Sequence, residues 1–78
     1  MDFDQWLISE KGYSKRSSRD AVYRLKRICR ILGTSEIPHD AVSLLENNSY
    51  YKELSVYVRS QLKRASHLFE EYCSRFDA

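Results

Sequence analysis

The sequence contains little glycine, proline or cysteine: two, one and two residues respectively among 78. So few turn-forming residues, and no sustained alternation of apolar and polar positions, disfavour β-strands. No apolar run is long enough to cross a membrane, and the N-terminus has no charged-then-apolar signal segment. We therefore expect a single all-α domain over residues 1–78, located in the cytoplasm and not in a membrane.

The sequence also lacks the residue groups on which catalysis and metal binding depend. Cys29 and Cys73 are too far apart to indicate a metal site or a disulfide framework, and we expect them to be buried, reduced thiols. His39 and His67 lie on different predicted elements, without a nucleophile or carboxylate at a recognisable spacing. No glycine-rich phosphate loop, HExxH or CxxC pattern occurs. We predict no enzymatic activity for this chain alone, no catalytic residue, no metal and no cofactor.

The spacing of apolar residues predicts two helices in the N-terminal half of the chain. The first covers about residues 3–10, with Asp2 as a candidate N-cap and Gly12 just past its end. The second follows Ser14, a favourable N-cap, and ends at Gly33. The residues expected to face the core are Phe3, Trp6 and Leu7 in the first helix and Ala21, Val22, Leu25, Ile28, Cys29 and Leu32 in the second.

Two further helices are predicted in the C-terminal half. The third is short, has Pro38 in its first turn and ends near residues 47–48. The fourth runs from about residue 49 to residue 75, because its apolar residues recur every three or four positions. The residues expected to be buried are Ala41, Val42, Leu44 and Leu45 in the third helix and Leu54, Val58, Leu62, Ala65, Phe69, Tyr72 and Phe76 in the fourth.

The second predicted helix concentrates positive charge on one face. The net charge of the chain is only +2, so the distribution of charge is more informative than its sum. Like charges three or four residues apart on a helix, such as Arg16 and Arg19, are mildly destabilising, which favours an anionic partner that offsets their repulsion. On the face opposite the core lie Arg16, Arg19, Tyr23, Lys26, Arg27 and Arg30.

A basic stripe of this kind is the electrostatic footprint of nucleic-acid binding. The hydroxyls of Ser14, Ser17 and Ser18 can bond phosphates or base edges, beside helix N-terminal amides that favour anions. The polar side of the last helix adds Arg59 and Lys63. The predicted DNA-binding residues are Ser14, Lys15, Arg16, Ser17, Arg19, Tyr23, Lys26, Arg27, Arg30, Arg59 and Lys63.

Two other interpretations of these patterns stay open. A basic face can be kept only for solubility, although here the charge is nearly all of one sign. An aromatic surface formed by Tyr50, Tyr51 and Tyr57 would instead favour a stand-alone helical module that binds a protein and regulates a DNA enzyme. Trp6 is expected in the core, because so small a domain needs its large aromatic residues inside.

The order and spacing of these motifs resemble the core-binding, SAM-like N-terminal domain of tyrosine recombinases, the phage-integrase family. The likeness covers about residues 3–72 and joins a "WL" pair, a glycine–aromatic–serine turn, a long helix ending at "LG" and the segment "SQLKRASHLFEEY". The residues that carry it are Phe3, Trp6, Leu7, Gly12, Tyr13, Ser14, Ser17 or Ser18, Leu25, Leu32, Gly33, Leu62, Ala65, Leu68, Phe69 and Tyr72.

The resemblance implies a small four-helix bundle that forms half of a C-shaped clamp on double-stranded DNA, with the second and fourth helices facing the major groove. In that family the catalytic arginines, histidine, lysine and tyrosine lie in a separate C-terminal domain, which is absent from this chain. The resemblance therefore implies binding at a recombination site without DNA cleavage by this chain alone. It also implies other protomers of the same recombinase as partners on DNA.

Overall fold

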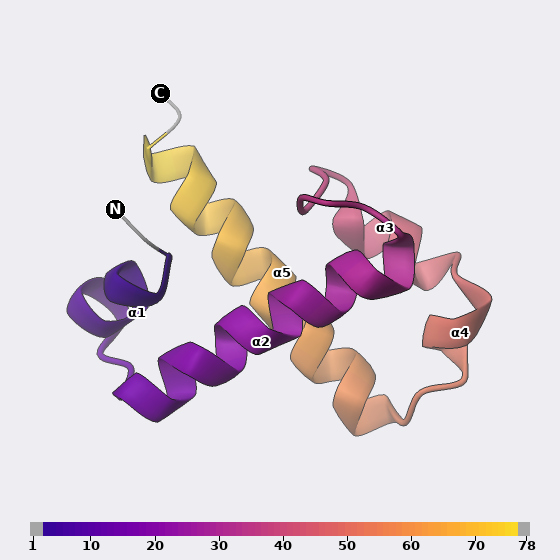
Figure 1. Cartoon of the computed structure of the whole chain (residues 1–78), viewed down its shortest axis with the longest axis horizontal. Coiled ribbons are helices and arrows are strands. Elements are labelled where there is room, and N and C mark those ends of the chain that lie inside the picture. Colours follow the sequence, from indigo (N-terminus) through magenta and orange to yellow (C-terminus); the bar gives the residue numbers. More distant parts are fainter. Residues whose placement is uncertain (1–2, 77–78) are drawn as a thin grey trace.

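The computed structural model describes residues 3–76, which form five helices and the segments that connect them (Figure 1). The two longest helices, α2 and α5, cross each other, and the molecule is flat, with extents of 35 × 27 × 17 Å. Within the described residues no strand is present, which confirms the all-α prediction. The helices are α1 (Phe3–Lys11), α2 (Lys15–Leu32), α3 (Ala41–Glu46), α4 (Ser49–Lys52) and α5 (Val56–Phe76).

The ends of α2 are set by the residues that the sequence indicated. Gly12, in the preceding turn, has a left-handed φ of 69°, which favours glycine. The Ser14 hydroxyl caps α2 by accepting the Ser17 amide N–H at 3.1 Å, and Gly33 ends the helix with a φ of 70°. These predictions are confirmed, whereas Asp2, the candidate cap of the first helix, lies outside the described residues.

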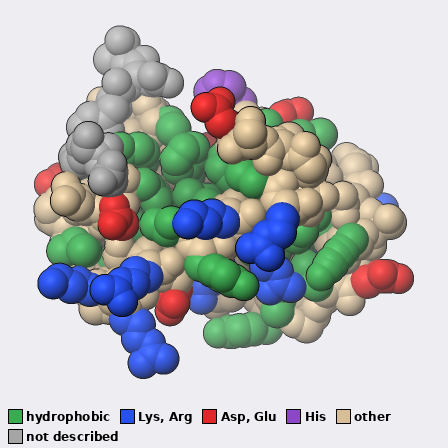
Figure 2. Space-filling view, viewed as in Figure 1, with side chains coloured by type: hydrophobic (Ala, Val, Ile, Leu, Met, Phe, Trp, Pro, Cys, Tyr) green, Lys and Arg blue, Asp and Glu red, His purple; other side chains and the backbone are tan. Residues whose placement is uncertain are grey.

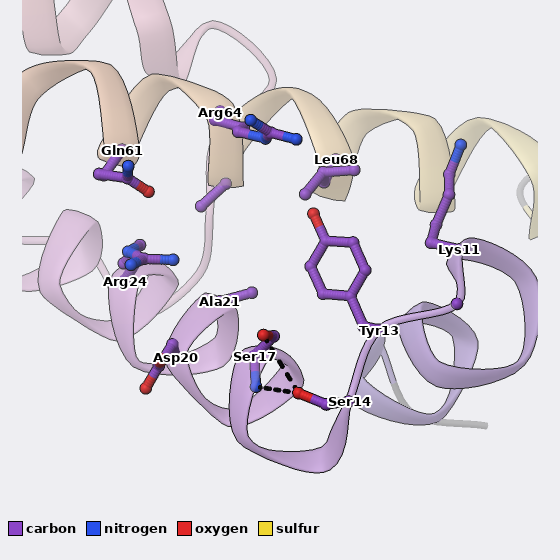
Figure 3. Close-up of a pocket in the computed structure, with 12 residues that line it drawn as sticks. Lys11, Tyr13, Ser14, Ser17, Asp20, Ala21, Arg24, Gln61, Arg64 and Leu68 are labelled. Carbon is purple, nitrogen blue, oxygen red and sulfur yellow. Dashed lines mark hydrogen bonds between the residues drawn. The ribbon is translucent and has the colours of Figure 1, made fainter.

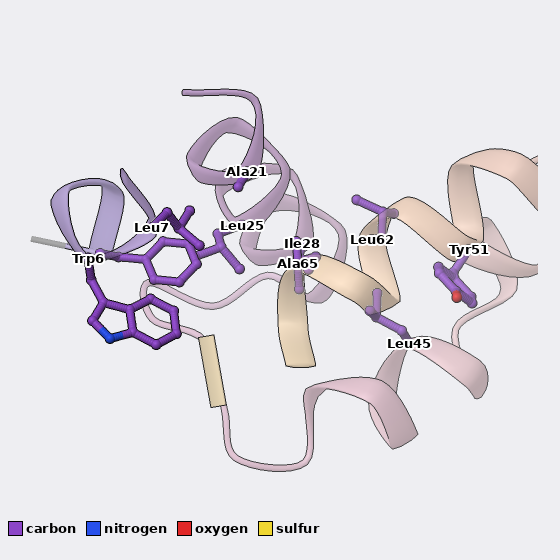
Figure 4. Close-up of a cluster of buried hydrophobic side chains, with 10 residues drawn as sticks. Trp6, Leu7, Ala21, Leu25, Ile28, Leu45, Tyr51, Leu62 and Ala65 are labelled. Atoms are coloured by element: carbon purple, nitrogen blue, oxygen red, sulfur yellow. The ribbon is translucent and has the colours of Figure 1, made fainter. Parts of the chain in front are cut away.

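The hydrophobic core runs from α1 through the crossing of α2 and α5 to α3 and α4 (Figure 4). Trp6 is 1% exposed, so its predicted place in the core is confirmed. The Phe3 ring meets Phe69 and Tyr72 edge-on, each at 5.5 Å between centroids, and these contacts pack α1 against the end of α5. The buried hydrophobic residues are Phe3, Trp6, Leu7, Ala21, Leu25, Ile28, Ala41, Leu45, Tyr51, Leu62 and Ala65.

The prediction of a single helix from residue 49 to residue 75 is wrong, because the structure has two helices there, separated by residues 53–55. The Ser55 hydroxyl accepts the Val58 N–H at 3.2 Å, which provides α5 with its own N-cap. The Tyr51 hydroxyl donates to the Arg59 carbonyl at 3.1 Å and fixes α4 against the first turn of α5. Local side-chain bonds of this kind compete with continuation of the helix.

The third helix also differs from its prediction. It begins at Ala41, and Pro38 lies before it in a turn closed by a bond from the Ala41 N–H to the Pro38 carbonyl at 3.2 Å. Ala41 and Leu45 are fully buried, but Leu44 is 40% exposed. Because a six-residue helix makes fewer than two turns, positions four apart share its buried face and Leu44 falls outside that face. The predicted burial of Leu44 is wrong.

The remaining residues that were predicted to lie in the core are only partly buried wherever the structure describes their side chains. Cys29 and Cys73 are half-buried, which corrects the expectation of buried thiols. The side chain of Phe76 lies outside the described part of the structure. Within residues 3–76, no helix combines the length and the apolarity that a membrane span requires. The half-buried members of the predicted core are Val22, Leu32, Val42, Leu54, Val58, Phe69 and Tyr72.

Candidate nucleic-acid interface

α2 presents a broad cationic face to solvent. Its 18 residues include seven Lys or Arg side chains and one acid, Asp20. Figure 2 shows Lys and Arg side chains gathered along the band that α2 occupies in Figure 1. Of the basic and aromatic residues of α2 that are predicted to bind DNA, Arg27 is half-buried, and the exposed ones are Lys15, Arg16, Arg19, Tyr23, Lys26 and Arg30.

The cations of α2 are not neutralised within the molecule. None of them takes part in an ion pair within residues 3–76. By contrast, Lys11 in α1 lies 2.6 Å from the Glu71 carboxylate, and Lys63 in α5 lies 3.0 Å from that of Glu46. The α2 face therefore directs its full positive charge toward solvent, where an anionic partner would remove the repulsion among neighbouring cations.

The three serines at the start of α2 have different surroundings. Ser14 accepts the Ser17 amide and donates its own hydroxyl hydrogen to the Ser17 hydroxyl at 3.2 Å, and both side chains remain exposed. Ser18 is only 1% exposed and donates to the backbone carbonyl of Asp4 at 3.0 Å. Its hydroxyl therefore joins α2 to α1, and the expectation that it bonds a phosphate or base is wrong.

Arg59 and Lys63 lie apart from the α2 face. They line a cavity of about 410 Å³ together with Glu46 and Tyr51, and none of its lining residues belongs to α2. Arg59 is half-buried instead of lying on an open polar face, and the hydrogen bond and charge of Glu46 raise the pKa of Lys63. A DNA contact by this pair stays a prediction, on a different flank of α5 from the one that α2 crosses.

Sequence reasoning missed a cleft of about 600 Å³ between α2, α5 and the turn that joins α1 to α2 (Figure 3). Arg24 reaches it from α2, and Arg64 and Gln61 reach it from α5. Arg24 lies on the flank of α2, between the stripe and the core face, so helical periodicity assigned it to neither set. The cleft exists only because α2 and α5 cross at this point, which the sequence did not reveal.

The structure shows which of Tyr50, Tyr51 and Tyr57 lie at the surface. Tyr51 is 2% exposed and belongs to the core, whereas Tyr50 is 48% and Tyr57 70% exposed. With Trp6 also buried, the aromatic surface on which a protein-binding module would depend is reduced to two tyrosines on different helices. This placement weakens the protein-interaction hypothesis.

The α2 face and the adjoining cleft form one continuous candidate surface, since Asp20 and Arg24 of α2 also line the cleft. Among the residues that the structure describes, no group of three His, Cys, Asp or Glu side chains could hold a metal ion. Comparison with protein-family models, curated proteins and solved structures gives no match to this chain, so its function is inferred from this surface.

Proposed function

We propose that this domain binds duplex DNA through the outward face of α2. The observation that carries the proposal is the set of seven cations on α2, none of which forms an ion pair within the described residues. Neutralising phosphates with such side chains releases condensed counterions, which supplies a large part of the binding free energy. The contacts are assigned to Lys15, Arg16, Arg19, Lys26, Arg27 and Arg30, with Ser14, Ser17 and Tyr23 as candidates for reading bases.

The shape of α2 suits this partner. At 1.5 Å per residue its 18 residues extend about 27 Å, which is shorter than one helical turn of DNA. The helix lies on the broad face of a molecule only 17 Å thick, so a duplex can approach it without meeting other elements first (Figures 1 and 2). The major groove of DNA is wide enough to admit an α-helix.

The resemblance to tyrosine recombinases extends the proposal to a biological role. On that basis the chain is the DNA-binding, core-binding domain of a site-specific recombinase, arranged as a SAM-like bundle. In this arrangement α1, α2, α3 and α5 correspond to the four expected helices, and α4 is an added turn. The domain holds the recombination site with other protomers, while a separate catalytic domain cuts the DNA.

Charge reversal tests the duplex proposal. The Arg16→Glu, Arg19→Glu double variant should bind a short duplex more weakly, by a similar factor for unrelated sequences, because phosphate contacts carry no sequence information. The slope of log affinity against log salt should fall by about two, one for each lost contact. Fluorescence anisotropy at several salt concentrations measures both quantities.

Lys52→Glu is the matched control, because Lys52 is an exposed cation on α4, outside the α2 face. It should change the affinity and the salt slope much less than reversal on α2 does. Equal effects of the two reversals would contradict the assignment to α2. If duplex produces no salt-sensitive amide shifts in α2 even at low salt, DNA binding is wrong and the protein-interaction hypothesis takes its place.

A further inference from the structure

A groove runs along one side of the crossing between α2 and α5. Its first section is the cleft of about 600 Å³, and its second section, of about 310 Å³, lies toward the start of α5. Asp20, Arg24 and Gln61 line both sections, so the two are directly adjacent. Together they form the α2–α5 groove. It lies beside the outward face of α2 and, unlike that face, is lined by residues of both helices.

The first section of the groove is cationic. Arg24 lies on the α2 wall and Arg64 on the α5 wall, and the side chain of Gln61 points from α5 toward Arg24 (Figure 3). Within residues 3–76 neither arginine takes part in an ion pair, although Asp20 of α2 also lines this section. Two guanidinium groups without acidic partners on facing walls are suited to a phosphate group, whose oxygens accept from their N–H donors.

The second section of the groove is aromatic. Tyr23 from α2 and Tyr57 from α5 line it together with Arg24 and Arg27. The two tyrosine side chains are 58% and 70% exposed, and apart from Tyr50 the other large rings that the structure describes belong to the core or pack against it. Figure 2 shows hydrophobic side chains among the Lys and Arg side chains near the crossing of α2 and α5.

Exposed rings beside arginines are the arrangement that binds a single nucleic-acid strand: cations track the backbone and bases stack on aromatic side chains. Stacking of this kind requires a base whose π-face is uncovered, and the bases of an intact duplex are covered by their neighbours. A section of about 600 Å³ is also within the size range of small-molecule sites. The groove therefore fits a short piece of one strand.

We propose that the α2–α5 groove binds single-stranded DNA, with phosphates at Arg24 and Arg64 and bases against Tyr57 and Tyr23. This inference shares with the proposed function the assumption that the partner is DNA and one assigned residue, Tyr23, whereas Tyr57, Arg24 and Arg64 are assigned to the groove alone. It adds a second site, in which α5 takes part, to the duplex-binding face of α2. A domain with both sites holds duplex DNA and an adjacent unpaired strand at the same time.

Binding of a labelled oligo-dT strand tests the proposal, because this strand forms no secondary structure of its own. Tyr57→Ala and Arg64→Ala should each weaken oligo-dT binding in an anisotropy titration, the first by about fivefold or more, the range expected for loss of one stacked base. Binding of a hairpin duplex should change by less than about twofold. Ring proton signals of Tyr57 should shift upfield as oligo-dT is added, which reports stacking directly.

Tyr50→Ala is the matched control, because Tyr50 is an exposed tyrosine on α4 and lines neither section of the groove. If Tyr57→Ala binds oligo-dT as tightly as the parent, or if Tyr50→Ala loses as much affinity, the groove assignment is overturned. Oligo-dT binding that depends on Tyr57 without any duplex binding would refute the proposed function and leave this inference standing. Duplex binding through α2, together with unchanged oligo-dT binding by Tyr57→Ala, would refute this inference and leave the proposed function standing.

Removing the charge of Asp20 tests the proposal through a variant that should bind oligo-dT more tightly than the parent. Asp20 lines both sections of the groove, and its negative charge opposes the binding of a phosphate nearby. Asp20→Asn keeps the shape of the side chain and removes the charge, so it should raise the affinity for oligo-dT severalfold. A folding defect cannot produce that result, and an unchanged or lower affinity would show that no phosphate enters the groove.

Discussion

At the scale of single residues, three serines at the start of α2 have three different structural roles. Ser14 caps the helix, Ser17 receives the hydroxyl of Ser14, and Ser18 is buried against the Asp4 carbonyl of α1. The cap could be predicted, since serine before a helical pattern is a local signal. The role of Ser18 could not, because it depends on where α1 packs.

The cap makes a direct prediction for stability. Ser14→Ala removes the acceptor of the Ser17 amide and should lower the free energy of unfolding by about 1 kcal/mol, measured by urea denaturation. Ser17→Ala is the control, because it removes a hydroxyl that caps nothing and should cost less than about 0.5 kcal/mol. An equal loss in the two variants would mean that the cap contributes nothing to stability.

At the scale of helices, the boundaries of α2 could be predicted and the break between α4 and α5 could not. Ser14 and Gly33 are strong local signals, and both lie at the ends of α2 in the structure. The apolar spacing continues through residues 53–55, so periodicity alone joined the two helices. What separates them is the Ser55 cap and the bond from Tyr51 to the Arg59 carbonyl, which depends on tertiary packing.

The link between α4 and α5 predicts a dependence on pH. Tyr51→Phe removes the hydrogen bond to Arg59 and should lower the free energy of unfolding by about 1 kcal/mol at neutral pH. Burial raises the pKa of the Tyr51 phenol above its usual 10.0, against the opposing charges of Lys63 and Arg59. As the pH rises above that value, the unfolded parent loses its Tyr51 proton before the folded parent does, so the parent becomes less stable.

Phenylalanine does not ionise, so the stability advantage of the parent over Tyr51→Phe should shrink as the pH rises above about 10. Lys63, whose pKa is also raised, titrates in both proteins and largely cancels from the comparison. Urea denaturation of the two proteins at a series of pH values measures the difference. An advantage that stays constant or grows with pH would contradict the buried hydrogen bond.

At the scale of the whole molecule, the candidate site was predictable in part. The stripe on α2 follows from helical periodicity, and its residues are exposed as expected except Arg27, which is half-buried. The groove was not predictable, because Arg64, Gln61 and Tyr57 join the α2 residues only through the crossing of α2 and α5. For the same reason, Arg59 and Lys63 share a helix with Arg64 but lie in a separate cavity beside α3 and α4.

The contact between the two ends of the described chain makes a prediction at this scale. Phe3→Leu and Phe69→Leu each remove one ring of an edge-on pair, so their effects on stability should not add. A double-mutant cycle by urea denaturation should give a coupling free energy of about 1 kcal/mol. The control pairs Phe3→Leu with Leu45→Val in helix α3, and the two losses of stability should add. A coupling free energy as large as that between Phe3 and Phe69 would argue against a specific ring contact.

The same contact fixes when the domain can finish folding during its synthesis. α1 leaves the ribosome first, yet the rings that cover Phe3 belong to the last turns of α5. At about 5–20 residues per second, several seconds therefore pass before the rings of α5 can cover Phe3, although α2 is already available to pack against α1. The packing of Phe3 is therefore completed only after the last turns of α5 have been synthesised.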